Sequence, residues 1–202
     1  NDVLRGDIGV STDGYVRIQQ QQSVHRLPHH PALIDLYSRL FGETVFVHPR
    51  HIIRAMTSHP GVHPTPPHQD FPHVQGSTNT WTCWSPLGDC PAALGSLAVL
   101  RGSHRLGFVP VQSAQGAGGL SVQLCKDDGD WLSTDFAVGD VLTFPAYTVH
   151  ASQPPLDRTR VRLSMDVRYQ PASDPIEARS LAPHADATWE QLYRDWTVDD
   201  LR

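Results

Sequence analysis

The clearest pattern along the chain is a strict alternation of apolar and polar residues from Val161 to Tyr169. A period of two predicts a β-strand with one apolar and one polar face, because successive side chains of a strand point to opposite sides. The apolar face holds Val161, Leu163, Met165, Val167 and Tyr169, and the polar face holds Arg162, Ser164, Asp166 and Arg168.

Most other segments also read as short strands. The main exception is 31–42, where apolar residues recur at helical spacing between Pro31 and Gly42, which are typical helix start and stop residues. A weaker helical stripe lies near 187–195. Seventeen prolines and fifteen glycines favour many short strands over long helices. We expect strands at 15–18, 44–47, 52–57, 80–86, 97–100 and 141–144, a loop at 113–119, and one domain, 1–202, with a β-sandwich or jelly-roll fold.

Composition excludes several classes of function. The net charge of −5 comes without a basic block, so no nucleic-acid partner is expected. No apolar run approaches the roughly 18 residues that a membrane helix needs. The three cysteines, Cys83, Cys90 and Cys125, show no zinc-type spacing and could be ordinary packed residues. A reducing, cytoplasmic location is the simplest expectation, since no signal peptide is visible.

A candidate metal pair lies at His68-Gln69-Asp70. On an extended segment, an imidazole and a carboxylate two residues apart point to the same side and can chelate one ion. Twelve histidines and eighteen aspartates in 202 residues make about one such triplet expected by chance. A second copy does occur at His184-Ala185-Asp186. The prolines before His68 and the strands after it favour the first copy.

A third ligand is expected from His150, at the end of an apolar strand that follows the turn at Gly139-Asp140. Two histidines and one carboxylate leave three positions of a metal open, as in non-haem iron(II) oxygenases. Alone, His150 could equally be a core histidine. Arg160 and Arg162 follow it and could anchor the distal carboxylate of a keto diacid, with Ser164 adding a hydroxyl, or they could be solvated surface charges.

Residues 50–171 resemble the phytanoyl-CoA dioxygenase family of iron(II)/2-oxoglutarate oxygenases. The resemblance rests on separate motifs in the family's order. They are His68-Gln69-Asp70, Trp84-Ser-Pro-Leu-Gly-Asp89, Gly95 to His104, Gly139-Asp140 through His150-Ala151-Ser152, and Arg162 to Tyr169.

The resemblance implies a mainly β, double-stranded β-helix fold with a few flanking helices. It implies Fe(II), O2 and 2-oxoglutarate as cofactor and cosubstrates, with decarboxylation to succinate. Arg162 is the favoured 2-oxoglutarate anchor, Arg160 stays open, and Ser152, Trp84 and Gln69 fall where the family lines the cosubstrate pocket, although each could serve packing alone.

The carboxylate Asp70 favours hydroxylation over halogenation, because related halogenases lack it. We expect hydroxylation of an unactivated C–H bond in a small organic molecule, such as a secondary metabolite. Desaturation, epoxidation or cyclisation would use the same residues. A non-catalytic jelly-roll binding protein and a cupin-type metal enzyme fit less well. The single lysine, Lys126, favours a compact substrate without phosphate groups.

Other expectations concern the surroundings of the site. The segments 19–31 and 111–130 are candidate lids, because specificity usually resides in loops. The remaining histidines are expected not to be ligands, although some could rim the pocket. We expect a monomer or a weak homodimer.

Overall fold

The computed structural model describes residues 3–124, 129–197 and 199. Its largest sheet is antiparallel and is built around the strand β12 (Arg162–Pro171). The strand order is β10-β5-β12-β3, and β4 pairs with the N-terminal part of β12. The other strands of this sheet are β3 (Val45–Val47), β4 (Ile52–Met56), β5 (Trp81–Pro86) and β10 (Leu142–Pro145).

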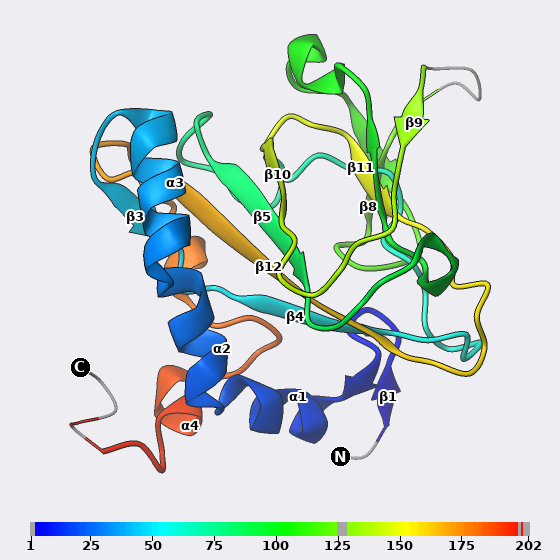
Figure 1. The fold of residues 1–202 in the computed structure, drawn as a ribbon, viewed down its shortest axis with the longest axis horizontal. Helices are drawn as coiled ribbons and strands as arrows, with labels where there is room; N and C mark the ends of the chain where they lie inside the picture. Colours follow the sequence, from blue (N-terminus) through cyan, green and yellow to red (C-terminus); the bar gives the residue numbers. More distant parts are fainter. Residues whose placement is uncertain (1–2, 125–128, 198, 200–202) are drawn as a thin grey trace.

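A second antiparallel sheet has the order β11-β6-β9, with bounds β6 (Leu97–Leu100), β9 (Trp131–Leu132) and β11 (His150–Ser152). Beside it lies the hairpin of β7 (Val111–Ser113) and β8 (Leu120–Val122) (Figure 1). The hydrogen-bonded sheets do not close into one barrel, but their arrangement is that of a jelly roll. The predicted mainly β fold with few helices is therefore confirmed.

Helices cover the outer side of the large sheet (Figure 1). α3 (Pro31–Phe41) begins and ends as predicted, with Gly42 in the left-handed conformation at φ 72°. Tyr37 of α3 stacks on Tyr169 of β12 with ring centroids 4.0 Å apart. The other helices are α1 (Thr12–Gln19), α2 (Gln22–Arg26) and α4 (Trp189–Leu192), and the 3-10 helices are η1 (Leu27–His29), η2 (Ala92–Leu94), η3 (Ser103–Leu106) and η4 (Ala178–Leu181).

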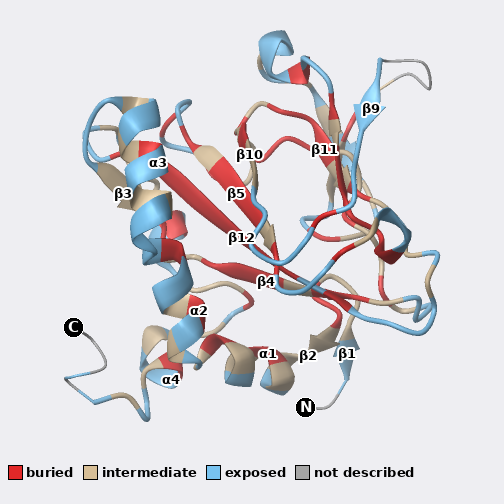
Figure 2. Cartoon of the chain, in the orientation of Figure 1, coloured by how far each residue is buried: buried red, intermediate tan, exposed pale blue. Residues whose placement is uncertain are grey.

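The two faces of β12 are both largely buried (Figure 2). On the apolar face, Met165, Val167 and Tyr169 join the core cluster that packs under the helices. On the polar face, the even-numbered side chains are buried in the interior rather than solvated. They are Arg162, Ser164, Asp166, Arg168 and Gln170. Burying charged groups is costly unless they are paired, so this face is expected to be functional or tightly networked.

The prediction of a strand at 15–18 is wrong. These residues lie inside α1, which Ser11 caps by accepting a hydrogen bond from the Gly14 amide. Tyr15 and Gln19 are buried one helical turn apart. An alternation over only four residues is too short to distinguish the two-residue period of a strand from the 3.6-residue period of a helix. A small ribbon of β1 (Leu4–Arg5) and β2 (Val10–Ser11) precedes the helix.

The other elements follow the sequence pattern closely, and the helix predicted near 187–195 is present but shorter. The candidate lid 19–31 is helical and packs beneath Tyr169, whose hydroxyl donates to the Pro28 carbonyl. No helix among residues 3–124, 129–197 and 199 combines the length and apolar character needed to cross a membrane. Cys83 and Cys90 are buried free thiols, and Cys125 lies outside the described residues.

Candidate metal centre

Backbone pairing brings the two predicted metal-ligand segments together. The His68 amide donates to the His150 carbonyl at 3.0 Å, and the His150 amide donates to the His68 carbonyl at 2.9 Å. This antiparallel bridge ties the Pro-rich extended segment to the first residue of β11. The two imidazoles consequently lie on the same side, with ring centroids 4.1 Å apart.

Three ligand atoms converge at this point. The Asp70 Oδ1 atom lies 3.7 Å from His68 Nε2 and 3.9 Å from His150 Nε2. All three residues are buried, and they form the one cluster in the part of the chain that the structure describes that could hold a metal ion. The structure therefore brings together the three residues that the sequence singled out.

The hydrogen bonds of the histidines determine which ring nitrogen is free. His68 Nδ1 lies 2.8 Å from the Pro66 carbonyl and His150 Nδ1 lies 3.0 Å from the Thr148 carbonyl. Because a carbonyl only accepts, each Nδ1 must donate, which leaves the Nε2 lone pair directed at Asp70 in the neutral ring. Burial and the neighbouring His68 lower the pKa of His150 to about 3, so this ring is neutral at physiological pH.

This arrangement fits a metal cation. Two Nε2 lone pairs and one carboxylate oxygen face one another in a buried space, and a bound cation would turn their mutual repulsion into coordination. Outer contacts that fix the ligands are typical of such sites. Both imidazoles here are held by backbone carbonyls, and the carboxylate is held as described next.

Both carboxylate oxygens of Asp70 accept a hydrogen bond. Arg168 Nη2 donates to its Oδ1 atom at 2.9 Å, and the Thr82 hydroxyl donates to its Oδ2 atom. Burial alone would raise the pKa of Asp70, but the charge of Arg168 and the contact with His68 hold it well below its usual value. The carboxylate is therefore ionised, as a metal ligand must be.

Arg162 is a buried cation with unsatisfied donors. Its side chain is 2% exposed, and its Nη1 atom donates to the Gly95 carbonyl at 2.6 Å. Among the described residues, its Nε and Nη2 atoms have no hydrogen-bond partner, and neither has the nearby Ser164 hydroxyl. The guanidinium lies 5.7 Å from the Trp84 ring centroid. Burial lowers the pKa of Arg162 to about 10, which still leaves it charged at neutral pH.

Trp84 and Ser152 line a small cavity together with His68, His150 and Arg168. The other two candidate cosubstrate residues lie elsewhere. Gln69 is buried and uses all its polar atoms on backbone, donating to Gly107 and Tyr147 carbonyls and accepting from the Val109 amide. Arg160 has a side chain 54% exposed and pairs with Asp157 at 2.8 Å.

The rival pair at 184–186 does not form a chelating site. His184 is directed inward and its Nδ1 atom lies 2.9 Å from the Tyr15 hydroxyl. The Asp186 side chain is 96% exposed. Positive φ angles at Ala185 (61°) and Asp186 (62°) break the extended geometry that would align the two side chains.

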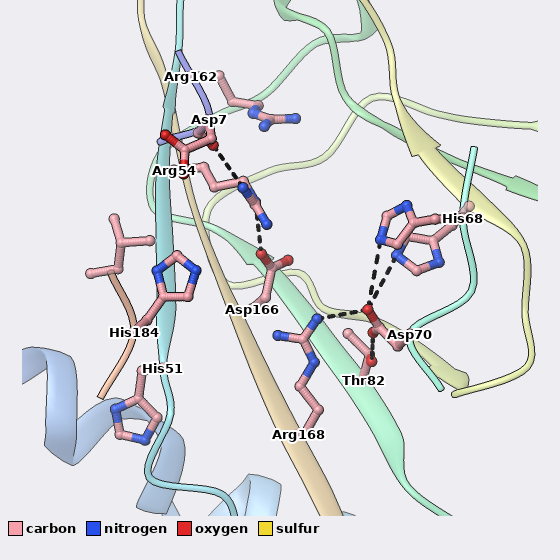
Figure 3. Close-up of polar contacts among 12 residues, drawn as sticks. Asp7, His51, Arg54, His68, Asp70, Thr82, Arg162, Asp166, Arg168 and His184 are labelled. Carbon is pink, nitrogen blue, oxygen red and sulfur yellow. Dashed lines mark hydrogen bonds and ion pairs between the residues drawn. The ribbon is translucent and has the colours of Figure 1, made fainter. Parts of the chain in front are cut away.

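A polar network along the inner face of β12 was not predicted from the sequence (Figure 3). Asp166 pairs with Arg54 of β4 at 3.3 Å, and two residues further on, Arg168 pairs with Asp70. The signal was present in the alternation itself, because Asp166 and Arg168 share the face of Arg162. Both residues could have been found by following the same face of the strand onward from Arg162.

Comparison with known proteins identifies the family of the chain. Residues 9–156 match the phytanoyl-CoA dioxygenase family, and the chain belongs to it. Dependence on iron and 2-oxoglutarate is a property of that family.

Two curated relatives are similar in sequence. They are the 1-deoxypentalenic acid 11-beta-hydroxylases of Streptomyces arenae and Streptomyces exfoliatus, each 32% identical over 180 residues. The matches cover 83% of this chain and 62% of each hydroxylase, so the chain spans less than two thirds of their length.

Solved structures share the fold. The epimerase SnoN, in complex with Fe3+, alpha ketoglutarate and nogalamycin RO, matches with a TM-score of 0.64 and 21% identity, covering 80% of this chain and 63% of that one. The non-heme monooxygenase ThoJ in its apo form matches with a TM-score of 0.62 and 22% identity, covering 75% and 56%.

Proposed function

We propose that this chain is an Fe(II)/2-oxoglutarate-dependent dioxygenase that hydroxylates an unactivated C–H bond of a small organic molecule. The observation that carries the proposal is the convergence of His68 Nε2, Asp70 Oδ1 and His150 Nε2 in a buried space. Membership of the phytanoyl-CoA dioxygenase family and the two hydroxylase relatives support it.

His68, Asp70 and His150 would hold iron(II), and the bound metal would supply oxidative chemistry with dioxygen and 2-oxoglutarate, releasing succinate. The residues of the chain position the reactants. Arg168 and Thr82 keep the Asp70 carboxylate ionised and oriented. The backbone carbonyls of Pro66 and Thr148 keep each Nε2 free to coordinate.

Arg162 is the proposed anchor for the distal carboxylate of 2-oxoglutarate. Two of its donors are unsatisfied among the described residues, and a buried cation without an anion is costly. Ser152 and Trp84 would complete this side of the pocket. Arg160 and Gln69 are less suited, because their polar groups already have partners at the surface or in the backbone.

A second outcome of the same chemistry is kept as a candidate, because SnoN, an epimerase, shares the fold. Desaturation, epoxidation or cyclisation would need the same metal residues. Mass spectrometry of the product separates oxygen insertion (hydroxylation or epoxidation, one oxygen atom added) from desaturation or cyclisation (two hydrogens removed), and NMR spectroscopy of the product distinguishes the outcomes within each group.

Three further properties are part of the proposal. Residues 1–202 form one domain, which the packing of α1, α2 and α3 residues against β12 supports. The protein acts in the cytoplasm, where the free thiols of Cys83 and Cys90 would stay reduced. It acts on a small molecule as a monomer or a weak homodimer.

The test is anaerobic titration with iron(II) and 2-oxoglutarate, followed through the metal-to-ligand charge-transfer band. We expect His68→Ala, Asp70→Ala and His150→Ala to abolish the band. His104→Ala is the matched control, because this exposed histidine lies outside the site. If a triad variant kept the parent's affinity for iron and 2-oxoglutarate, the proposal would be wrong.

A further inference from the structure

A larger cavity adjoins the candidate metal centre, and its wall is rich in arginine. It has a volume of about 160 Å³ and shares His68, Arg54 and Arg168 with the small cavity beside Trp84. Four arginines line it, namely Arg50, Arg54, Arg168 and Arg179, against the carboxylates of Asp7 and Asp70.

Two of these arginines are neutralised by the protein itself. Arg54 pairs with Asp166, and Arg168 pairs with Asp70 (Figure 3). Asp7 does not compensate for the others, because its carboxylate pairs with Arg5 at 2.8 Å. The cavity therefore carries an excess of positive charge.

Arg50 and Arg179 hold that excess. Within the described ranges 3–124, 129–197 and 199, no ion pair joins either of them to a carboxylate. Arg50 is half-buried and donates to the Ala182 and Pro183 carbonyls at 3.2 and 2.5 Å, which fixes its guanidinium against the wall. Burial and then the charge of Arg179 lower the pKa of Arg50, so the two cations repel each other in the protein alone.

The histidines of this cavity do not change the balance at neutral pH. Burial, with the charge of Arg168 acting in the same direction, lowers the pKa of His48 and of His73 to about 4. Burial, followed by Arg54 and Arg50, lowers the pKa of His184 to about 2. All three rings are therefore neutral, and the positive charge is concentrated on the guanidiniums.

The remaining wall offers an apolar surface beside the metal centre. Ile52, Val74 and Ala117 line the same cavity as His68 and Asp70. A ligand that bound here with an anionic end at the arginines would place its carbon skeleton against these side chains and beside the triad. A guanidinium fork is also well matched to a carboxylate.

We infer that the substrate carries a carboxylate, which pairs with Arg50 and Arg179 while the apolar skeleton lies beside His68 and Asp70. The inference rests on the proposed function, because it assigns this cavity to the substrate and leaves 2-oxoglutarate to the cavity lined by Trp84 and to the proposed anchor Arg162. Arg50 and Arg179 then select for acids over neutral molecules of the same shape.

The test measures binding rather than turnover. The metal-free full chain is titrated by calorimetry with cyclohexanecarboxylate, adamantane-1-carboxylate and decanoate, and with the primary amide of each. At least one acid should bind with a dissociation constant below about 1 mM, and its amide should bind at least about tenfold more weakly. Equal binding of acid and amide, or no acid binding below about 1 mM, would overturn the inference.

Variants locate the effect. Arg50→Gln and Arg179→Gln should each weaken binding of the acid by about tenfold and leave the affinity for the amide unchanged. Arg101→Gln is the control, because this exposed arginine does not line the cavity. An equal loss in the control, or none in either cavity variant, would contradict the assignment.

Competition with 2-oxoglutarate separates the two cavities. The acid should still bind when 2-oxoglutarate and a catalytically inert divalent metal saturate the triad site, and Arg50→Gln should leave 2-oxoglutarate affinity unchanged. If Arg50→Gln weakened 2-oxoglutarate instead, the arginines would belong to the cosubstrate site. Failure of the parent to bind iron would contradict the proposed function, whereas the metal-free comparison of acid and amide would still test the inference.

Discussion

Arg160 and Arg162 lie two residues apart, yet their surroundings differ completely. Arg160 is mostly exposed and has a carboxylate partner in Asp157, whereas Arg162 is 2% exposed and has no carboxylate partner among the described residues. An exposed pair contributes little to stability or binding, while a buried cation with open donors has much to gain from an incoming anion.

Replacing Arg162 should therefore impair cosubstrate binding selectively. We expect Arg162→Gln to weaken binding of 2-oxoglutarate by about ten- to a hundredfold, because a charge-assisted hydrogen bond is lost. The affinity for iron should stay near that of the parent. The charge-transfer band reports 2-oxoglutarate binding, and anaerobic equilibrium dialysis reports iron. Arg160→Gln is the matched control; a loss of 2-oxoglutarate affinity there, but not in Arg162→Gln, would reverse the assignment.

At the level of elements, β12 explains how the site is held. Its apolar face packs under the helices, and its polar face supplies Arg162 at one end and Arg168 near the other. The antiparallel bridge between His68 and His150 then sets the triad opposite this face. One strand thus carries both the proposed cosubstrate anchor and the arginine that pairs with Asp70, the candidate metal-ligand carboxylate.

The loop before β6 supports Arg162 through Gly95. This glycine has φ of 76°, and a Cβ there would lie 2.3 Å from the Gln153 carbonyl oxygen. Its own carbonyl accepts the hydrogen bond of Arg162. Glycine is therefore required at this position for two reasons: the backbone is left-handed, and the Gln153 carbonyl leaves no room for a Cβ atom.

We expect Gly95→Ala to destabilise the protein by more than Gly102→Ala does. Gly102 has φ of 74°, and a Cβ added to it would meet nothing within 4 Å, so alanine there should cost only the backbone strain of about 1–2 kcal/mol. Gly95→Ala adds a clash with backbone and should also weaken 2-oxoglutarate binding. Urea unfolding measures both free energies, and equal losses would show that the close approach is unimportant.

At the level of the whole molecule, several histidines are buried in neutral form. Burial, with the nearby His25 and His29 acting in the same direction, lowers the pKa of His51 to about 3. Both ring nitrogens of His51 are buried without a hydrogen-bond partner among the described residues. His48 and His184 are shifted in the same direction.

These shifts predict acid sensitivity. Because the folded-state pKa lies below the unfolded value of about 6.5, the unfolded chain binds more protons as pH falls below that value. The contribution of these neutral histidines to the free energy of unfolding is fully present above about pH 6.5. It is lost progressively as the pH falls toward the folded-state pKa. His51 alone should contribute a loss of about 2 kcal/mol between pH 7.5 and pH 5.

The variant His51→Leu isolates that contribution. Its free energy of unfolding, measured in urea at the two pH values, should fall by about 2 kcal/mol less than that of the parent. His104→Leu should keep the parent's pH dependence, because that histidine is exposed. An unchanged pH dependence in His51→Leu would show that this ring does not titrate on unfolding.

The sequence predicted the long or strongly patterned elements and the chemistry of the site. The alternation of β12, the proline and glycine limits of α3, and the His68-Gln69-Asp70 motif are local features, so they can be read without the fold. The strand expected at 15–18 failed because four residues do not distinguish a period of two from a helical turn, and the Ser11 cap decided for the helix.

By itself, the sequence determined several of the strands, the residue types of the site and the presence of a polar stripe on one strand. Only the tertiary structure decided that His150 meets His68 and Asp70 while His184 and Asp186 diverge. It also decided that Arg162 is buried while Arg160 is exposed, and that Arg50 and Arg179 share one cavity. The physical reason is distance along the chain. Asp70 meets His150 and Arg168 through strand pairing and burial, which no local pattern encodes.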